Sequence, residues 1–198
     1  MGSRRSDSPV VTSPTVDVPL PVKIVIAGGF AVGKTTTVAA ISEIAPRTTE
    51  AAMTDVSVGV DDTTGAEQKS STTVAMDFGR IGLGDDLILY LFGTPGQDRF
   101  RFMWDDLIRG AIGAVVLVDT TRLVSCFPAI DYFEAQDVPF VVAVNCFHGE
   151  VAHPVEEVRE ALQVRPDVPM VLMDARDRES VRATLLELVQ HALVRTAS

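Results

Sequence analysis

The stretch GGFAVGKT, residues 28–35, constrains this chain more than any other part of its sequence. It matches the pattern G-x-x-x-x-G-K-[S/T], and it lies between the apolar, β-branched run PVKIVIAG and the segment KTTTVAAISEIA, which has a helical composition. A glycine-rich turn between a strand and a helix points several backbone N–H groups at one place, and the helix dipole favours an anion there. The sequence therefore predicts a loop that binds phosphate groups.

The residue types in this loop predict how it would hold a nucleoside triphosphate. Gly28 and Gly33 let the backbone turn and approach phosphate oxygens closely. Lys34 would place a positive charge on the β- and γ-phosphates, and Thr35 would offer its hydroxyl to Mg²⁺. The motif alone identifies neither the base nor the reaction. The predicted phosphate-binding residues are Gly28, Phe30, Ala31, Val32, Gly33, Lys34, Thr35 and Thr36.

Apolar runs alternate with helical segments along the rest of the chain. Runs such as IGAVVLVD and PFVVAVN lack the period-two alternation of a half-exposed strand, which indicates a mostly parallel sheet with helices on both faces. Two adjacent strand segments, TTVAMDFGRI and DLILYLFG, suggest one antiparallel edge strand. We expect an α/β fold, the three-layer sandwich of P-loop NTPases, with a six-stranded sheet.

Four further expectations concern organisation. Residues 1–21 are predicted to be a flexible tail rich in Ser, Pro and Thr, and residues 22–196 to form one domain. The polar residues 47–71 lack a clear period and are predicted to be a long loop. Ser125 is a predicted N-cap of the helix SCFPAIDYFEAQ.

The composition of the chain argues against nucleic acid as a partner and against insertion into a membrane. The 198 residues carry a formal net charge of -10, which argues against nucleic acid as a partner. The two cysteines form no CxxC pattern, as expected for a protein of the reducing cytoplasm. No apolar run reaches the roughly 18 residues that a membrane span requires, so direct membrane insertion is not expected.

Several segments resemble a known protein family. LYLFGTPGQDRF, residues 89–100, resembles W-D-T-A-G-Q-E-R-F of the Ras superfamily of small GTPases, and TVAMDF, residues 73–78, resembles T-I-G-V-D-F. More narrowly, TTEAAMTD, TTVAMDFGRI, LFGTPGQDRFRFMWDDLIRGAIGAVVLVD and FVVAVN together resemble the MglA-like small GTPases of actinobacterial conservons. In those operons the GTPase accompanies a sensor-kinase-like membrane protein and a Roadblock-type regulator. The resemblance implies a cytoplasmic GTP/GDP switch that hydrolyses GTP slowly, binds such partners and reaches the inner face of the membrane only through one of them.

The resemblance also implies that two segments are nucleotide-sensing switches, the first at TVAMDF and the second at LYLFGTPGQDRF. Thr73 would bind Mg²⁺, with Thr72 as a rival by register. Gly96 would contact the γ-phosphate through its backbone, and Gln97 would orient the attacking water, with Lys34 as the second catalytic residue. Gly93 stands where the wider superfamily has a magnesium-binding aspartate, a residue that MglA-like proteins as a group lack, so a weaker grip on Mg²⁺ is expected.

Negative charge develops in the transition state of GTP hydrolysis, and the cation that stabilises it would come from Arg47, Arg99, Arg101 or a partner.

The base-recognition motif departs further from the superfamily. In place of N-K-x-D the chain has NCFH, which keeps Asn145 but puts His148 where an aspartate accepts two hydrogen bonds from guanine. A neutral histidine accepts only one, so poor base specificity is expected. MDAR stands where the superfamily has S-A-K, which places the Ala175 N–H near guanine O6 and Arg176 beside the base.

Three other interpretations stay open from the sequence. The chain could be a degenerate scaffold without hydrolysis, a nucleotide-binding protein with relaxed ATP/GTP specificity, or a metabolic P-loop kinase, although no arginine-rich lid segment is evident. The aromatic cluster around Trp104 could belong to the core or to an exposed patch beside the second switch.

Overall fold

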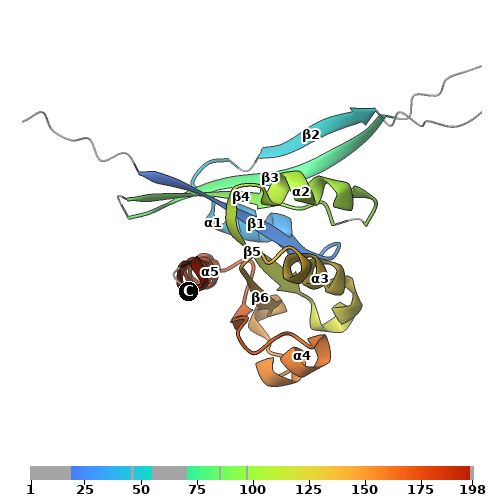
Figure 1. Ribbon diagram of the computed structural model, residues 1–198, viewed down its shortest axis with the longest axis vertical. Coiled ribbons are helices and arrows are strands. Elements are labelled where there is room, and N and C mark those ends of the chain that lie inside the picture. The colour runs from blue at the N-terminus through green and yellow to red at the C-terminus, as the bar shows by residue number, and fades with distance from the viewer. Residues whose placement is uncertain (1–18, 46, 55–70, 85, 97, 197–198) are drawn as a thin grey trace, which may run out of the picture.

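The computed structural model describes residues 19–45, 47–54, 71–84, 86–96 and 98–196, without the side chains of 47–54, 71–75, 98–99 and 148. Within these residues, seven strands form one sheet in the order β2-β3-β4-β1-β5-β6-β7 (Figure 1). The strands are β1 (Leu20–Gly28), β2 (Arg47–Thr54), β3 (Ser71–Leu83), β4 (Leu87–Gly93), β5 (Ala111–Val118), β6 (Phe140–Asn145) and β7 (Met170–Met173). The α-helices are α1 (Lys34–Ile41), α2 (Trp104–Ile108), α3 (Phe127–Ala135), α4 (Val155–Leu162) and α5 (Arg178–Thr196), with short 3₁₀ segments η1 (Asp98–Met103), η2 (Thr120–Ser125) and η3 (Phe147–Gly149).

The pairing of the strands confirms the predicted fold class. β4, β1, β5, β6 and β7 pair in parallel, whereas β3 runs antiparallel to both of its neighbours, β2 and β4. The strand count was predicted one too low. Arg47–Thr54, which was predicted to be part of a loop, is the edge strand β2, so the antiparallel strand β3 lies one place inside the edge. The sequence of β2, RTTEAAMT, has no apolar pattern that would predict a strand. What identifies it as a strand is its backbone pairing with β3.

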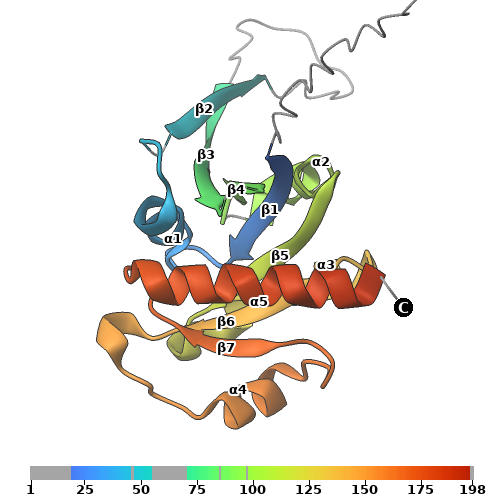
Figure 2. The same cartoon turned by 90° about the vertical axis from the view of Figure 1, so that its left-hand side faces the viewer.

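Two hydrophobic cores, one on each face of the sheet, explain the continuous apolar runs. Along β1, Ile24 and Ile26 pack in one core, while Val25 and Ala27 pack in the other. The first core lies under α1 and α5, and the second under α2, α3 and α4 (Figure 2). A strand buried on both faces needs apolar residues at successive positions, which removes the alternation of a half-exposed strand.

The start of one strand and the start of one helix bring two smaller corrections. β1 starts at Leu20, two residues before the predicted domain boundary, because Leu20 already pairs with Leu87 of β4. Ser125 is not the N-cap of α3: that position is Cys126, and the Ser125 hydroxyl donates instead to the Arg122 carbonyl at 2.8 Å.

The aromatic residues that follow the segment LYLFGTPGQ are divided between the core and the surface. Trp104 is 5% exposed and stacks on Phe133 with ring centroids 6.2 Å apart, whereas Phe102 is 59% exposed. The interpretation of Trp104 as a core residue is therefore confirmed. No helix among the described residues is long and apolar enough to cross a membrane.

The fold brings the predicted motifs to one edge of the sheet. β1 ends at Gly28, β4 at Gly93, β6 at Asn145 and β7 at Met173. These strands are parallel, so their carboxyl ends and the loops that follow them lie together. In open α/β sheets this is the edge where ligands bind.

Candidate functional site

The phosphate loop between β1 and α1 depends on two glycines in the left-handed region of backbone space. Gly28 has φ +132°, and a Cβ atom there would lie 2.5 Å from the carbonyl oxygen of Leu117. Gly33, with φ +109°, is the N-cap of α1, and a Cβ atom there would lie 2.8 Å from Nδ2 of Asn145. No other residue type fits either position without moving the backbone, so the loop geometry is fixed by the sequence.

Lys34 is the buried cation of the site. Its side chain is 8% exposed and folds back over its own loop, where Nζ donates to the carbonyl oxygens of Gly28 at 3.0 Å and Gly29 at 2.6 Å. Burial lowers the pKa of Lys34 to about 8, while the Asp77 carboxylate acts in the opposite direction. The lysine is thus held with its ammonium group at the mouth of the loop.

Thr35 meets a carboxylate that the sequence interpretation had not assigned. Its Oγ1 donates to Oδ2 of Asp77 on β3 at 2.6 Å. A Cβ atom on Gly93 of β4 would lie 3.0 Å from Cβ and 3.2 Å from Oδ2 of Asp77. Asp77 therefore fills the space in which a side chain at position 93 would lie. It belongs to the segment TVAMDF, which was already singled out, but only the structure shows that β3 brings it beside Thr35.

One cavity of about 480 Å³ joins the phosphate loop to the segment after β4. Gly96 closes one side of it, and a Cβ atom there would lie 2.7 Å from Nζ of Lys34 and 3.0 Å from Cα of Phe30. Thr94 is 3% exposed, and its Oγ1 has no hydrogen-bond partner among the described residues. The cavity is lined by Phe30, Ala31, Gly33, Lys34, Thr35, Thr36, Asp77, Thr94, Pro95 and Gly96.

Val32, another predicted loop residue, has a different place. Its side chain is 1% exposed and packs in the core under α1, so only its backbone belongs to the loop surface.

Thr35 and Thr73, the two predicted ligands of Mg²⁺, do not lie side by side. Thr73 lies four residues before Asp77 on β3, opposite Ala52 of β2, and Thr72 lies opposite Met53. At about 3.3 Å per residue, four residues of strand place Thr73 roughly 13 Å from Asp77 along β3. In this arrangement Asp77 therefore takes the place beside Thr35, and the magnesium role of Thr73 stays a prediction.

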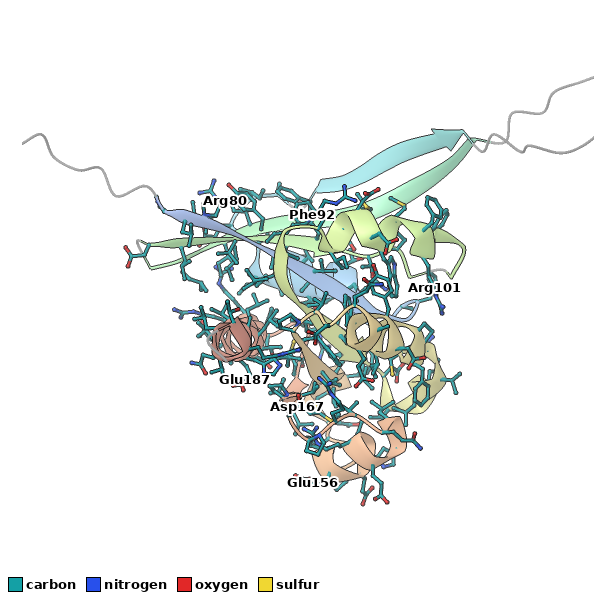
Figure 3. All side chains as sticks on the ribbon, in the orientation of Figure 1. Arg80, Phe92, Arg101, Glu156, Asp167 and Glu187 are labelled. Carbon is teal, nitrogen blue, oxygen red and sulfur yellow. The ribbon has the colours of Figure 1, made fainter. Side chains whose placement is uncertain are left out.

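The remaining catalytic candidates are placed only in part. Gln97 lies outside the described residues. Arg47 opens β2 and Arg99 belongs to η1, with side chains outside the description. Arg101 is exposed and lies on the α2–α3 side of the molecule (Figure 3). No arginine is thereby assigned to the transition state.

Asn145 ties the predicted base region to the phosphate loop. Its side chain is buried, Nδ2 donates to the Val32 carbonyl at 2.9 Å, and Oδ1 accepts the Ala175 N–H at 3.1 Å. The Ala175 N–H, predicted to meet the base, is therefore engaged within the protein. A second cavity, of about 230 Å³, lies here and is lined by Gly33, Thr36, Asn145, Phe147, Asp174, Ala175 and Arg176. The side chain of His148 lies outside the description.

This combination of fold and loop defines a P-loop protein with the G-domain fold. A model of the family described as conserved hypothetical ATP binding protein matches residues 26–195, and the chain belongs to that family. An uncharacterized protein of Methanocaldococcus jannaschii is 29% identical over 126 residues, which cover 63% of this chain and 69% of that protein.

Two more similarities point to the same fold. The Ras-related protein SEC4 of Candida albicans is 27% identical over 127 residues, and the match spans 59% of this chain and 60% of SEC4. The structure of the G domain of the T. maritima FeoB iron transporter superposes with a TM-score of 0.62 at 16% identity, covering 87% of this chain and 99% of that one. At this identity the structural likeness supports the fold alone.

Proposed function

We propose that this protein is a GTP-binding molecular switch that binds GTP or GDP with Mg²⁺ and hydrolyses GTP slowly. The observation that carries the proposal is the approach of Gly96 to the phosphate loop, where a single added carbon would lie 2.7 Å from Nζ of Lys34. A phosphate held by Lys34 would meet the backbone at Gly96. The conformation of the segment after β4 would then depend on which nucleotide is bound.

The phosphate groups would be held by charge and by backbone amides. Lys34 Nζ already lies at the mouth of the loop, and the N-terminus of α1 directs its N–H groups there. An anion would strengthen the charged form of Lys34, because burial disfavours that charge in the free protein.

The residues present fit a magnesium ion. Thr35 and Asp77 place a hydroxyl and a carboxylate oxygen within 2.6 Å of each other. Thr94, whose buried hydroxyl has no protein partner in the described part of the chain, lines the same cavity. Oxygen ligands of this kind suit Mg²⁺, which keeps several waters. When bound, Mg²⁺ would neutralise charge on the β- and γ-phosphates. Thr73 would join these residues only after a shift of β3.

Hydrolysis would use the residue that follows Gly96. We propose that Gln97 orients the attacking water and that Lys34 stabilises the developing negative charge. Arg122 lines a neighbouring cavity together with Phe30 and Gly96. We propose that hydrolysis is slow unless a partner supplies or positions a cation beside Lys34.

We also propose that this switch is a small GTPase of the MglA-like conservon type. The sequence segments that resemble MglA-like conservon GTPases support signal transduction in the cytoplasm, with a Roadblock-type regulator and a sensor-kinase-like conservon protein as partners. The partners would bind according to the nucleotide state, and one of them would recruit the protein to the inner face of the membrane. Binding to nucleic acid is not expected at a formal net charge of -10.

Nucleotide binding and single-turnover hydrolysis test the proposal. Wild-type protein should bind GTP and GDP more tightly with Mg²⁺ than with EDTA, and it should release phosphate slowly. Gln97→Leu should keep GTP binding and slow phosphate release, whereas Lys34→Ala should lose binding. A wild-type protein that binds no nucleotide with Mg²⁺ would overturn the proposal.

A second candidate, a degenerate scaffold that holds nucleotide without hydrolysis, is favoured by His148, which stands where the superfamily has the aspartate that reads guanine. Tight GTP binding without any phosphate release, with or without a candidate phosphate acceptor, would establish it. Acceptor-dependent phosphate transfer would instead identify a kinase.

A further inference from the structure

A cavity of about 540 Å³ lies between the phosphate loop, η2 and the start of α3. Phe30 and Gly96 line both this cavity and the one that contains Lys34, so the two cavities adjoin. Among the described residues that line the larger cavity, Arg122 is the charged one. Arg122 was not among the arginines predicted from the sequence, yet it lines the cavity next to the one predicted to hold the γ-phosphate.

The segment that carries Arg122 packs directly against the phosphate loop, because residue 29 has no side chain. A Cβ atom on Gly29 would lie 2.4 Å from Oγ and 2.6 Å from Cβ of Ser125. The Ser125 hydroxyl in turn donates to the Arg122 carbonyl at 2.8 Å. The Gly29 carbonyl also accepts a 2.6 Å hydrogen bond from Nζ of Lys34. One loop residue therefore contacts both the buried lysine and the segment that carries Arg122.

A buried carboxylate holds the guanidinium of Arg122. Oδ2 of Asp119 accepts Nε at 3.0 Å and Nη2 at 2.9 Å, while Oδ1 accepts the N–H of Thr121 at 2.9 Å and its hydroxyl at 2.7 Å. Burial by itself would raise the pKa of Asp119, but these hydrogen bonds outweigh burial and hold the pKa below its ordinary value. The aspartate therefore stays charged and neutralises the arginine in the free protein.

Arg122 is nevertheless able to change its partner. Two of its five N–H donors bind Asp119, and its side chain is 49% exposed, in contrast to 6% for the aspartate. If the arginine moves, Asp119 keeps both of its hydrogen bonds from Thr121, so the buried carboxylate is not left without partners. A γ-phosphate carries more negative charge than one carboxylate and also accepts a guanidinium fork, so it competes with Asp119 for Arg122.

We propose that Arg122 is the cation for the transition state of GTP hydrolysis and that Asp119 withholds it in the free protein. The inference rests on the proposed function, since it adds a residue to the same reaction. In hydrolysis a water oxygen bonds to the γ-phosphorus while the bond to the oxygen that bridges the β- and γ-phosphorus breaks, which yields GDP, inorganic phosphate and a proton. Arg122 stabilises the negative charge on the oxygens around the γ-phosphorus during this exchange.

The competition between Asp119 and the phosphate also accounts for slow hydrolysis. The guanidinium is bound to Asp119 for most of the time, so only a small fraction of the molecules has the cation in place. A partner that loosens the bonds between Asp119 and Arg122 would accelerate hydrolysis without supplying an arginine of its own.

Single-turnover GTP hydrolysis tests the inference. Asp119→Asn keeps an oxygen for the Thr121 N–H but removes the charge that holds Arg122, so hydrolysis should be about tenfold or more faster. Arg122→Ala should be about tenfold or more slower than wild type, and the double variant should be as slow as Arg122→Ala. A merely structural ion pair would not give opposite signs in the two single variants. The control Glu179→Gln, which breaks another i,i+3 pair with Arg182 on α5, should behave as wild type.

Binding of GDP with aluminium fluoride, a mimic of the phosphoryl group in transfer, gives a readout that does not depend on turnover. Asp119→Asn should bind the mimic more tightly than wild type and Arg122→Ala less tightly, whereas both should bind GDP alone as wild type does. Arg122→Lys keeps a positive charge beside Asp119 and serves if either variant folds poorly. It should also bind the mimic less tightly, because an ammonium group lacks the planar fork.

Three results would overturn this inference but not the proposed function. They are hydrolysis in Asp119→Asn that is no faster than in wild type, a gain that survives in the double variant, and unchanged binding of the mimic in the Arg122 variants. A wild-type protein that binds no nucleotide would overturn both.

Discussion

Thr35 Oγ1 donates a 2.6 Å hydrogen bond to Oδ2 of Asp77, across 42 positions of sequence. The contact links the first turn of α1 to β3, and it brings a carboxylate to the threonine that was predicted to bind Mg²⁺. Gly93, on the adjacent strand β4, makes room for it, since a Cβ atom there would lie 3.0 Å from Cβ of Asp77. The glycine that looked like a lost metal ligand is therefore the neighbour of a carboxylate supplied by another strand.

The first prediction concerns this carboxylate. Asp77→Asn should raise the Mg²⁺ concentration needed for half-maximal GTP retention by about tenfold or more, because an amide neither carries the charge nor accepts from Thr35 as strongly. Nucleotide dissociation measured across a Mg²⁺ titration checks this. Asp131→Asn, at an exposed position of α3, is the matched control and should behave as wild type. An unchanged Mg²⁺ requirement in Asp77→Asn would show that Asp77 does not contribute to Mg²⁺ binding.

The second prediction moves the carboxylate between strands. Gly93→Asp should lower the melting temperature, because the new Cβ atom would lie 3.2 Å from Oδ2 of Asp77 and two carboxylates would share one space. The double variant Gly93→Asp with Asp77→Gly, which also removes the Cβ atom that would lie 3.0 Å away, should regain melting temperature relative to Gly93→Asp. It should regain Mg²⁺-dependent GTP retention relative to Asp77→Gly alone. Thermal unfolding and the same Mg²⁺ titration measure both effects. Additive losses in the double variant would show that the two positions are independent.

The third prediction is a pH dependence of nucleotide binding. The free protein has a Lys34 pKa of about 8, and a bound phosphate raises it, so binding takes up a proton above that pH and none well below it. GTP affinity should therefore be constant near pH 7 and fall as the pH rises through about 8. Calorimetry in two buffers of different ionisation enthalpy counts the protons. Lys23→Arg, which alters another lysine with a lowered pKa, should keep the effect. The absence of proton uptake above the Lys34 pKa would contradict it.

The fourth prediction concerns Asn145 as a structural bridge. Asn145→Ala would leave the Val32 carbonyl and the Ala175 N–H without their partner, and each buried unpaired group costs about 1–3 kcal/mol. We expect a free energy of unfolding lower by about 2 kcal/mol or more, together with weaker binding of all nucleotides. Asn145→Asp should be at least as destabilising, because a carboxylate oxygen would face the Val32 carbonyl. Chemical denaturation gives the comparison, and wild-type stability in both variants would rule out the bridge.

Much of the fold follows from local sequence. The strand–loop–helix at Gly28 to Lys34 was predictable because its glycines, lysine and flanking apolar run all act within a few residues of each other. The central strands were predictable because both of their faces are buried. Strand β2 was missed, since RTTEAAMT has no apolar pattern and its pairing partner begins at Ser71.

The sequence by itself determined the phosphate loop, the α/β class and the order of its elements, because these depend on short-range backbone geometry and on burial. Only the tertiary structure decided which side chains meet across strands. Asp77 reaches Thr35, Gly96 closes on Lys34, and Asp174 joins the cavity beside Asn145. Strand register and loop packing set these contacts, and neither is encoded in the spacing of any one motif.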